Sequence, residues 1–237
     1  RDNWTAAVAD AAQVPTDFEY VAFFAVTSGR ENNVIWDETW GREEMSAFNT
    51  LADRLGPDPR APWVDEGATG ADGVHPHYKQ TKYSDLGSDI PVVKGTEMRL
   101  IEAEAFLRNS DLGNAVLKID EARAEYGLGN VTPAPTTIND AWVLLDNERL
   151  LTLWMEGRRW HDARRWDEAG MSFMPAVQYV YGNSMSVYND PTPLTPIFEK
   201  DVSLSKRAAC IPISLAECDT NENLVGAPEC AGAFVAP

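Results

Sequence analysis

The stretch from Thr96 to Trp166 constrains the fold of this 237-residue chain most strongly. Apolar residues recur there at intervals of three and four positions, which is the spacing of one face of an α-helix. Two such stripes follow one another, and small alanines on both allow two helices to approach closely. The first stripe consists of Met98, Ile101 and Ala105, widened by Leu100 and Phe106, and the second of Ala115, Ile119, Ala122 and Tyr126.

Turn and capping residues separate the expected helices. Asn109-Ser110-Asp111 has the composition of a turn with a helix cap, and Gly127 and Gly129 are expected to end the second helix. After a loop with two prolines, Asn139 or Asp140 is expected to cap a third helix. The pattern is typical of tetratricopeptide-like helical hairpins. We therefore predict a mainly α fold with such hairpins and extensive irregular loops wrapped over them.

Charged and indole side chains alternate from Glu156 to Trp166. If this segment is one helix, Glu156 lies beside Arg159 and Trp160, and Asp162 lies beside Arg165 and Trp166. A glycine inside a helix is costly and usually marks a close backbone approach, which we expect at Gly157. We interpret the segment as a packed junction between helices. The alternative is a catalytic site that uses Glu156, His161 and Asp162.

The motifs of this half of the chain resemble the carboxy-terminal half of SusD/RagB-family proteins. The resemblance rests on an acidic-aliphatic helix pair, then Glu-Gly-x-Arg-Trp-x-Asp-x-x-Arg from 156 to 165, then Pro212-Ile213 with Glu217 and Asn221. Asp58-Pro59-Arg60 also fits the family, and we expect Asp58 and Arg60 to fix that turn as a pair. Structural roles are assigned to Glu148, Glu156, Gly157, Arg159, Trp160, Asp162 and Arg165.

The resemblance implies a function without catalysis. Such proteins are nutrient-binding lipoproteins at the extracellular face of an outer membrane, where they cover a TonB-dependent transporter of the SusC type and capture oligosaccharides or peptides. The chain resembles only the carboxy-terminal part of such a protein, so we expect a missing amino-terminal half as a partner and a lipid anchor on a segment not in this chain. An incomplete helical array exposes apolar surface that a partner covers.

Composition narrows the classes of partner. Thirty-seven acidic and twenty basic residues give a net charge of −17, which argues against binding nucleic acid through a basic patch. No apolar run is long enough to span a bilayer. No composition shift divides the chain, so we predict one region over 1–237, with a helical core at about 96–169 and loop-rich segments at 30–94 and 170–237.

Aromatic residues beside amide and carboxylate groups suggest where a ligand binds. Sugars stack on ring faces and bond to polar neighbours, so we place Asn33, Trp36 and Trp40 in or beside a loop as candidate ligand-binding residues. The alternative is that the indoles fill the core. The long Gly- and Asp-rich segment that follows is expected to be a binding rim, with Trp63, Tyr78 and Tyr83 as its candidates.

No residue pattern in the chain points firmly to a metal or to catalysis. His75 and His77 are better explained as loop residues than as a metal pair. Asp65, Glu66 and Asp72 allow a structural calcium ion, although their spacing is not that of an EF-hand. No phosphate loop, nucleophile elbow or zinc-protease motif occurs, so we expect no enzyme and no cofactor. The remaining alternatives are an assembly subunit that binds protein and a carbohydrate hydrolase.

The three cysteines lie in the last part of the chain. In an exported protein this helix-poor tail is a natural place for a disulfide. We favour a bond between Cys218 and Cys230, with Cys210 buried, and Cys210 with Cys218 is the alternative. Three tyrosines near the tail, Tyr179, Tyr181 and Tyr188, are expected to pack over the helices.

Overall fold

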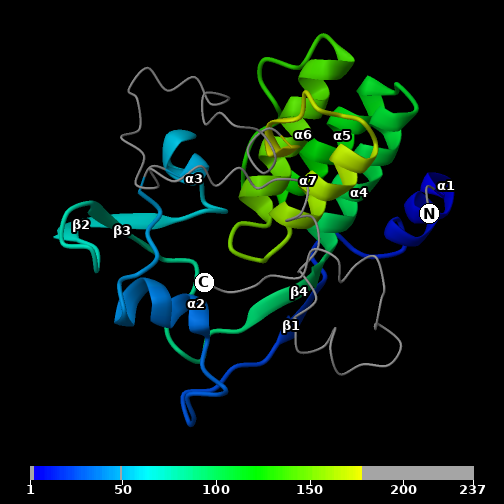
Figure 1. The fold of residues 1–237 in the computed structure, drawn as a ribbon. Coiled ribbons are helices and arrows are strands. Elements are labelled where there is room, and N and C mark those ends of the chain that lie inside the picture. The colour runs from blue at the N-terminus through cyan, green and yellow to red at the C-terminus, as the bar shows by residue number, and fades with distance from the viewer. Residues whose placement is uncertain (1–2, 49, 178–237) are drawn as a thin grey trace, which may run out of the picture. The chain divides into compact units, whose positions relative to one another are not determined.

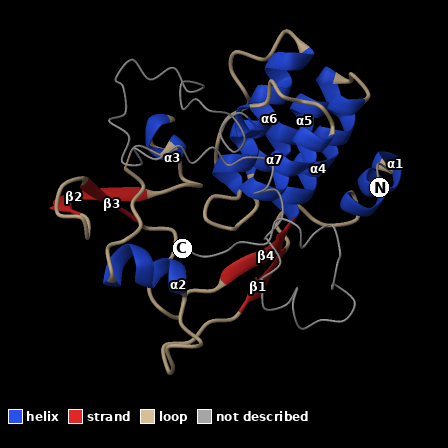
Figure 2. Ribbon diagram, in the orientation of Figure 1, coloured by secondary structure: helices blue, strands red, loops and turns tan. Residues whose placement is uncertain are grey.

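The computed structural model describes residues 3–48 and 50–177. The chain divides into two compact units, residues 1–162 and residues 163–237, and each is described by itself. The expectation of a mainly helical fold is confirmed (Figure 2). The principal helices are α1 (Trp4–Ala11), α4 (Gly95–Arg108), α5 (Leu112–Ala124), α6 (Ile138–Thr152) and α7 (Arg159–Glu168).

Helices α4, α5 and α6 pack side by side in the first unit, and α1 lies against α4 (Figure 1). On α5, the predicted stripe residues Ala115, Ile119 and Ala122 are fully buried. On α4, Ala105 is buried but Met98 and Ile101 are only half-buried. A single apolar stripe does not describe the buried face of α4, because α1, α5 and α6 all pack against this helix.

The central position of α4 explains its buried charges. Arg99, Glu102 and Glu104 are all buried, and each has a charged neighbour or a carbonyl partner. The Arg99 guanidinium donates to the carbonyl oxygens of Ala11 and Val14 at 2.6 and 3.0 Å. Carbonyls at the end of a helix have no partner within it, so Arg99 satisfies the carboxyl end of α1.

The helix caps follow the expected chemistry with one exception. The Asp111 side chain accepts a hydrogen bond from the Asn114 amide at 3.1 Å and caps α5, as predicted. The predicted cap at Asn139 or Asp140 is wrong. Thr137 caps α6, because its hydroxyl oxygen accepts from the Asp140 amide at 3.1 Å, and the Asp140 carboxylate accepts from that hydroxyl at 2.7 Å.

Two antiparallel two-stranded sheets lie in the segment before α4. One pairs β1 (Glu19–Ala22) with β4 (Ile90–Lys94), and the other pairs β2 (Trp63–Thr69) with β3 (Pro76–Gln80). The long segment that we expected to be a loop rim is therefore largely a hairpin. The pairing register of the hairpin shifts between Asp65 and Thr69. Side chains therefore do not alternate regularly between the two faces of β2, and the sequence lacks the pattern of a regular strand.

The β1–β4 sheet leads directly into α4 through Gly95. A methyl group at Gly95 would lie 1.8 Å from the carbonyl oxygen of Pro15, which no side chain can tolerate. The Gly95 amide also donates to the Phe18 carbonyl at 2.7 Å. Close passage of the chain before β1 over the start of α4 therefore requires glycine here.

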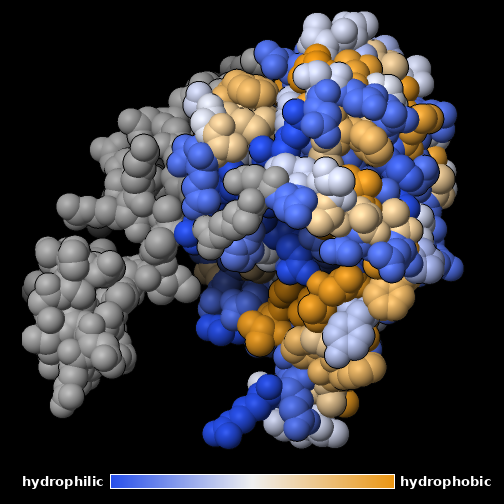
Figure 3. Space-filling view, turned by 90° about the vertical axis from the view of Figure 1, so that its right-hand side faces the viewer, coloured by the Kyte–Doolittle hydropathy of each residue, from blue (hydrophilic) through white to orange (hydrophobic). Residues whose placement is uncertain are grey.

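The β1–β4 sheet also carries exposed apolar side chains. Phe23 is 83% exposed and Tyr20 60% exposed, and Phe18 and Val92 are exposed as well. Figure 3 shows apolar side chains gathered in the lower part of the face it presents. Surface of this kind commonly marks an interaction site.

Three short helical segments precede the hairpin: α2 (Val34–Trp36), the π-helix η1 (Asp37–Gly41) and α3 (Leu51–Arg54). Trp36 and Trp40 therefore lie on short helical segments beside a loop, which is one of the two placements expected. Asn33 caps α2, since its side-chain oxygen accepts from the Trp36 amide at 3.1 Å while its nitrogen donates to the Ser88 carbonyl at 2.7 Å. These two bonds favour a helical start over a loop.

Candidate functional site

The turn after α6 carries the Glu156-Gly157 motif. Helix α6 ends at Thr152 and α7 begins at Arg159, so the segment from Glu156 to Trp166 is not one helix and the expected neighbours of Glu156 are wrong. Asp162, Arg165 and Trp166 all belong to α7, as expected. Gly157 lies in the turn with φ of +74°, and nothing lies within 4 Å of where its Cβ would be. Glycine is needed for this left-handed backbone and not for a close approach.

Glu156 is instead the shared partner of two lysines from other segments. Its Oε1 accepts from the Lys82 ammonium at 2.6 Å and from the Lys94 ammonium at 2.7 Å. Lys82 also donates to the Trp154 carbonyl at 2.7 Å, and Lys94 to the Thr152 carbonyl at 2.6 Å. We call Lys82, Lys94 and Glu156 the lysine clamp, because they fasten the turn to the segment that enters α4.

Ion pairs between α6 and α7 form the helix junction. Arg149 donates from Nε and Nη2 to both oxygens of Asp162 at 2.8 Å, and Arg159 pairs with Asp146. Burial lowers the pKa of Arg149, but the Asp162 carboxylate outweighs burial and raises the pKa overall. The junction thus exists between helices. Trp160 is half-buried, and within the second unit the Arg165 guanidinium lies 5.4 Å from the Trp166 ring centre.

The catalytic alternative for this segment has no geometric support. Asp162 is buried and engaged by Arg149, whereas His161 is exposed. Glu156 is held by two lysines. These three side chains therefore serve different surroundings and do not converge on one reacting atom.

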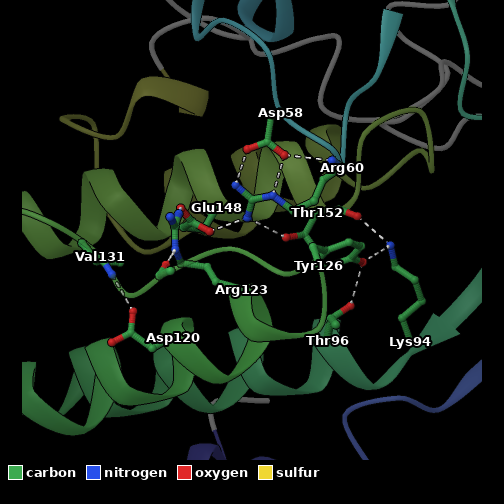
Figure 4. Close-up of polar contacts among 11 residues, drawn as sticks. Asp58, Arg60, Lys94, Thr96, Asp120, Arg123, Tyr126, Val131, Glu148 and Thr152 are labelled. Atoms are coloured by element: carbon green, nitrogen blue, oxygen red, sulfur yellow. Dashed lines mark hydrogen bonds and ion pairs between the residues drawn. The ribbon is translucent and has the colours of Figure 1, made fainter.

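The Asp58-Pro59-Arg60 turn forms the predicted pair (Figure 4). Arg60 donates from Nε and Nη2 to the two carboxylate oxygens of Asp58 at 2.9 and 2.7 Å. Burial raises the pKa of the Asp58 carboxyl, but the hydrogen bonds from Arg60 outweigh it and lower the pKa below its usual value. Arg60 also pairs with Glu148, which in turn accepts from Arg123 at 2.6 Å. Glu148 therefore joins α5, α6 and the turn.

Aromatic side chains gather on the β2–β3 hairpin. The Trp63 and Tyr78 rings stack with centres 4.6 Å apart and planes 4° apart, and Phe48 meets Tyr78 edge-on at 5.2 Å. All three side chains are half-buried. Burial raises the pKa of Tyr78, and the carboxylates of Asp65 and Asp53 add to this. We call Phe48, Trp63 and Tyr78 the ring cluster.

A second pair of rings lies across η1. Trp36 and Trp40 stack with centres 6.5 Å apart, and the Trp40 indole nitrogen donates to the Gln80 carbonyl at 2.7 Å. The Lys79 ammonium lies 4.9 Å from the Trp40 ring centre and pairs with Glu43 and Glu66 at 3.1 and 3.2 Å. Trp40 is thereby held in the scaffold, while Trp36 stays half-buried beside it.

Two of the predicted ligand-binding residues are used by the fold. Asn33 is fully buried and caps α2, and Tyr83 is 3% exposed with its hydroxyl 3.4 Å from the Met155 carbonyl. The candidate rim therefore excludes both. Phe48 was missed because its packing partner Tyr78 lies thirty residues later in the chain, which the sequence does not show. Strand alternation would have placed Trp63 and Tyr78 on one face of the hairpin.

The histidines and Asp72 of the hairpin have partners of their own. Backbone hydrogen bonds from Val74 and His75, with the His75 ring at 2.6 Å, lower the pKa of Asp72 to about 2. The expectation that His77 is a loop residue is wrong, because it lies on β3 and is fully buried, with Nε2 2.7 Å from the Thr39 carbonyl. Within residues 3–48 and 50–177, no three His, Cys, Asp or Glu side chains are grouped so that they could hold a metal ion.

Several expectations concern residues outside the described part of the chain. They are the tyrosines at 179, 181 and 188, the disulfide between Cys218 and Cys230 with its alternative through Cys210, and the turn with Glu217 and Asn221. None of the helices described is long and apolar enough to cross a membrane.

Comparison with known proteins identifies one family. The family model of the SusD family matches residues 67–229. Two solved structures from Bacteroides vulgatus are similar, each at 17% identity: a SusD-like carbohydrate binding protein (TM-score 0.47, 68% of this chain and 41% of that one) and a SusD superfamily protein (TM-score 0.38, 74% and 40%). This chain thus spans about two fifths of their length. No curated protein matches it.

Proposed function

The chain belongs to the SusD family, and on this premise we propose that it binds an oligosaccharide without chemically changing it. Peptide is the second ligand class within this proposal. The setting proposed is the extracellular face of an outer membrane, where the protein, anchored by a lipid on a segment outside this chain, covers a TonB-dependent transporter of the SusC type. The exposed apolar β1–β4 sheet supports a protein partner, which we take to be an amino-terminal half or the transporter.

The observation that carries the proposal is the ring cluster. Trp63 and Tyr78 stack face to face on a hairpin and are half-exposed, so a ligand could contact an outer ring face. Ring faces contact the apolar side of a pyranose, and polar groups around them bond to hydroxyls. Asp65 lies opposite Tyr78 in the hairpin register and is exposed, so it supplies an acceptor beside the rings.

The test is a glycan array followed by titration calorimetry with the glycan that binds best. Replacing Trp63 or Tyr78 by Ala should weaken binding about tenfold, which corresponds to about 1.4 kcal/mol. Tyr20→Ala is the matched control, because Tyr20 is an exposed tyrosine on the other sheet. Trp36→Ala should have a smaller effect. Equal affinity of the Trp63 and Tyr20 variants would remove the ring cluster from the site.

A further inference from the structure

A pocket of about 250 Å³ lies between the Asp58-Pro59-Arg60 turn, β4 and the end of α6. Three prolines, Pro59, Pro62 and Pro91, supply apolar wall, and the lysine clamp supplies polar wall. The volume suits one sugar ring or one amino acid. None of the ring cluster lines it, so this pocket and the aromatic surface are separate features.

Among the described residues, the charges of the pocket wall do not balance once the exposed Glu19 at its rim is set aside. Arg60 is matched by Asp58 and Glu148, and Glu148 is further matched by Arg123, so two positive and two negative groups cancel there. In the lysine clamp, by contrast, two ammonium groups share one oxygen of one carboxylate. Two positive charges against one negative charge leave one positive charge in excess. An uncompensated buried charge is costly, and an anionic occupant would offset it.

Lys82 is the most exposed member of the lysine clamp and is therefore the group that an anionic ligand would contact. Its side chain is 16% exposed, compared with 8% for Lys94 and 1% for Glu156. Within the described part of the chain, Lys82 donates to the Trp154 carbonyl and to Glu156, so one N–H of its ammonium remains for a ligand. Burial lowers the pKa of Lys82, and the neighbouring Lys94 adds to this against the opposing effect of Glu156.

A negative charge also stands at the pocket rim. Glu19 lines the pocket from β1, where its register partner is Lys94, and its side chain is exposed to solvent. Water screens an exposed carboxylate far better than a buried group. Glu19 therefore reduces the attraction for an anion without cancelling the buried excess, and removing its charge should strengthen anion binding.

We propose that this pocket binds a small organic carboxylate, whose oxygen accepts a hydrogen bond from the Lys82 ammonium while its carbon skeleton contacts the prolines. Two sources share this chemistry, a uronic acid and the carboxylate of an amino acid or peptide end. The proposal is independent of glycan binding at the ring cluster.

The experiment measures binding to the full chain by calorimetry with two matched pairs of probes. Glucuronate against glucose tests a sugar acid, and N-acetylalanine against its amide tests a peptide-type carboxylate. In at least one pair the acid should bind about tenfold or more tightly than its neutral mate, and the pair that does so identifies the source. Equal binding within both pairs, or no binding of either acid at millimolar concentration, overturns the proposal.

Variants then locate the site. Lys82→Met should weaken binding of the preferred acid at least about tenfold, whereas Lys118→Met, at a lysine paired with Glu121 on α5, should not. If Lys82→Met fails to fold by circular dichroism, Glu19→Gln decides, because it changes only an exposed rim and should tighten binding about twofold. Retained affinity in a folded Lys82→Met variant would contradict the site. If Lys82→Met does not fold, unchanged affinity in Glu19→Gln would contradict it. Trp63→Ala should leave this binding intact even though it weakens glycan binding.

Discussion

The helical body and the β2–β3 hairpin use their polar and aromatic groups in opposite ways. In the body, charged side chains are buried and paired, as in the lysine clamp and the Arg149–Asp162 pair. On the hairpin, Lys79 is buried and paired, but the carboxylates of Asp65 and Glu66 lie at the surface and the rings stay half-exposed. Buried pairs hold helices in place, while exposed rings are free to meet a ligand. Damage to the body should therefore unfold the protein, and damage to the ring cluster should change binding.

The largest effect is expected where β4 enters α4. Gly95→Ala should destabilise the protein by roughly 3–5 kcal/mol, because the new methyl group would overlap the Pro15 carbonyl and the chain would have to move. Gly113→Ala on α5 is the control. No atom lies within 4 Å of its Cβ position, so it should stabilise by up to about 1 kcal/mol. Urea unfolding measures both, and a small loss in Gly95→Ala would refute the close approach.

The lysine clamp should come next. Glu156→Gln removes the shared negative charge and leaves Lys82 and Lys94 buried together, so a loss of about 3–5 kcal/mol in unfolding free energy is expected. Glu121→Gln, at a surface pair with Lys118, should cost at most about 1 kcal/mol. If the two variants lost the same stability, the contrast between buried and exposed pairs would be wrong.

The Asp58–Arg60 pair should show its contribution through pH. Arg60 lowers the pKa of Asp58 in the folded protein, so the unfolded chain binds a proton at Asp58 more readily. The stabilisation is therefore complete above the unfolded pKa of about 4 and is lost as pH falls through the lower folded pKa. The difference in unfolding free energy between wild type and Asp58→Asn should be constant above about pH 5 and shrink below pH 4. A difference that grows on acidification would contradict the pair.

The sequence predicted the helical hairpins because periodicity depends on neighbours within a helix. Ala115, Ile119 and Ala122 show this directly. Glu156 could not be placed from the sequence, because its partners lie more than sixty residues away on other elements. The prediction for Gly157 was also wrong. The sequence around a glycine does not show whether the residue is needed for a positive φ or for close packing, and here it is the positive φ.

Only part of the candidate site could be predicted, because the sequence shows residue types but not contacts between distant segments. Residue type made Trp63 and Tyr78 candidates for sugar binding, but it did not show that they stack on one another. The irregular register between Asp65 and Thr69 concealed the hairpin. Asn33 and Tyr83 have the residue types of a binding site, and only their burial shows that the fold uses them.

The contrast between body and hairpin is tested most directly by measuring two quantities on two tryptophan variants. The quantities are the dissociation constant for the best-binding glycan and the free energy of unfolding. Trp63→Ala should lose about tenfold in affinity with a small loss of stability, because its ring is half-exposed. Trp142→Ala, in the core at 5% exposure, should lose about 3–5 kcal/mol of stability and, while folded, keep its affinity. Unchanged affinity in Trp63→Ala would contradict the account.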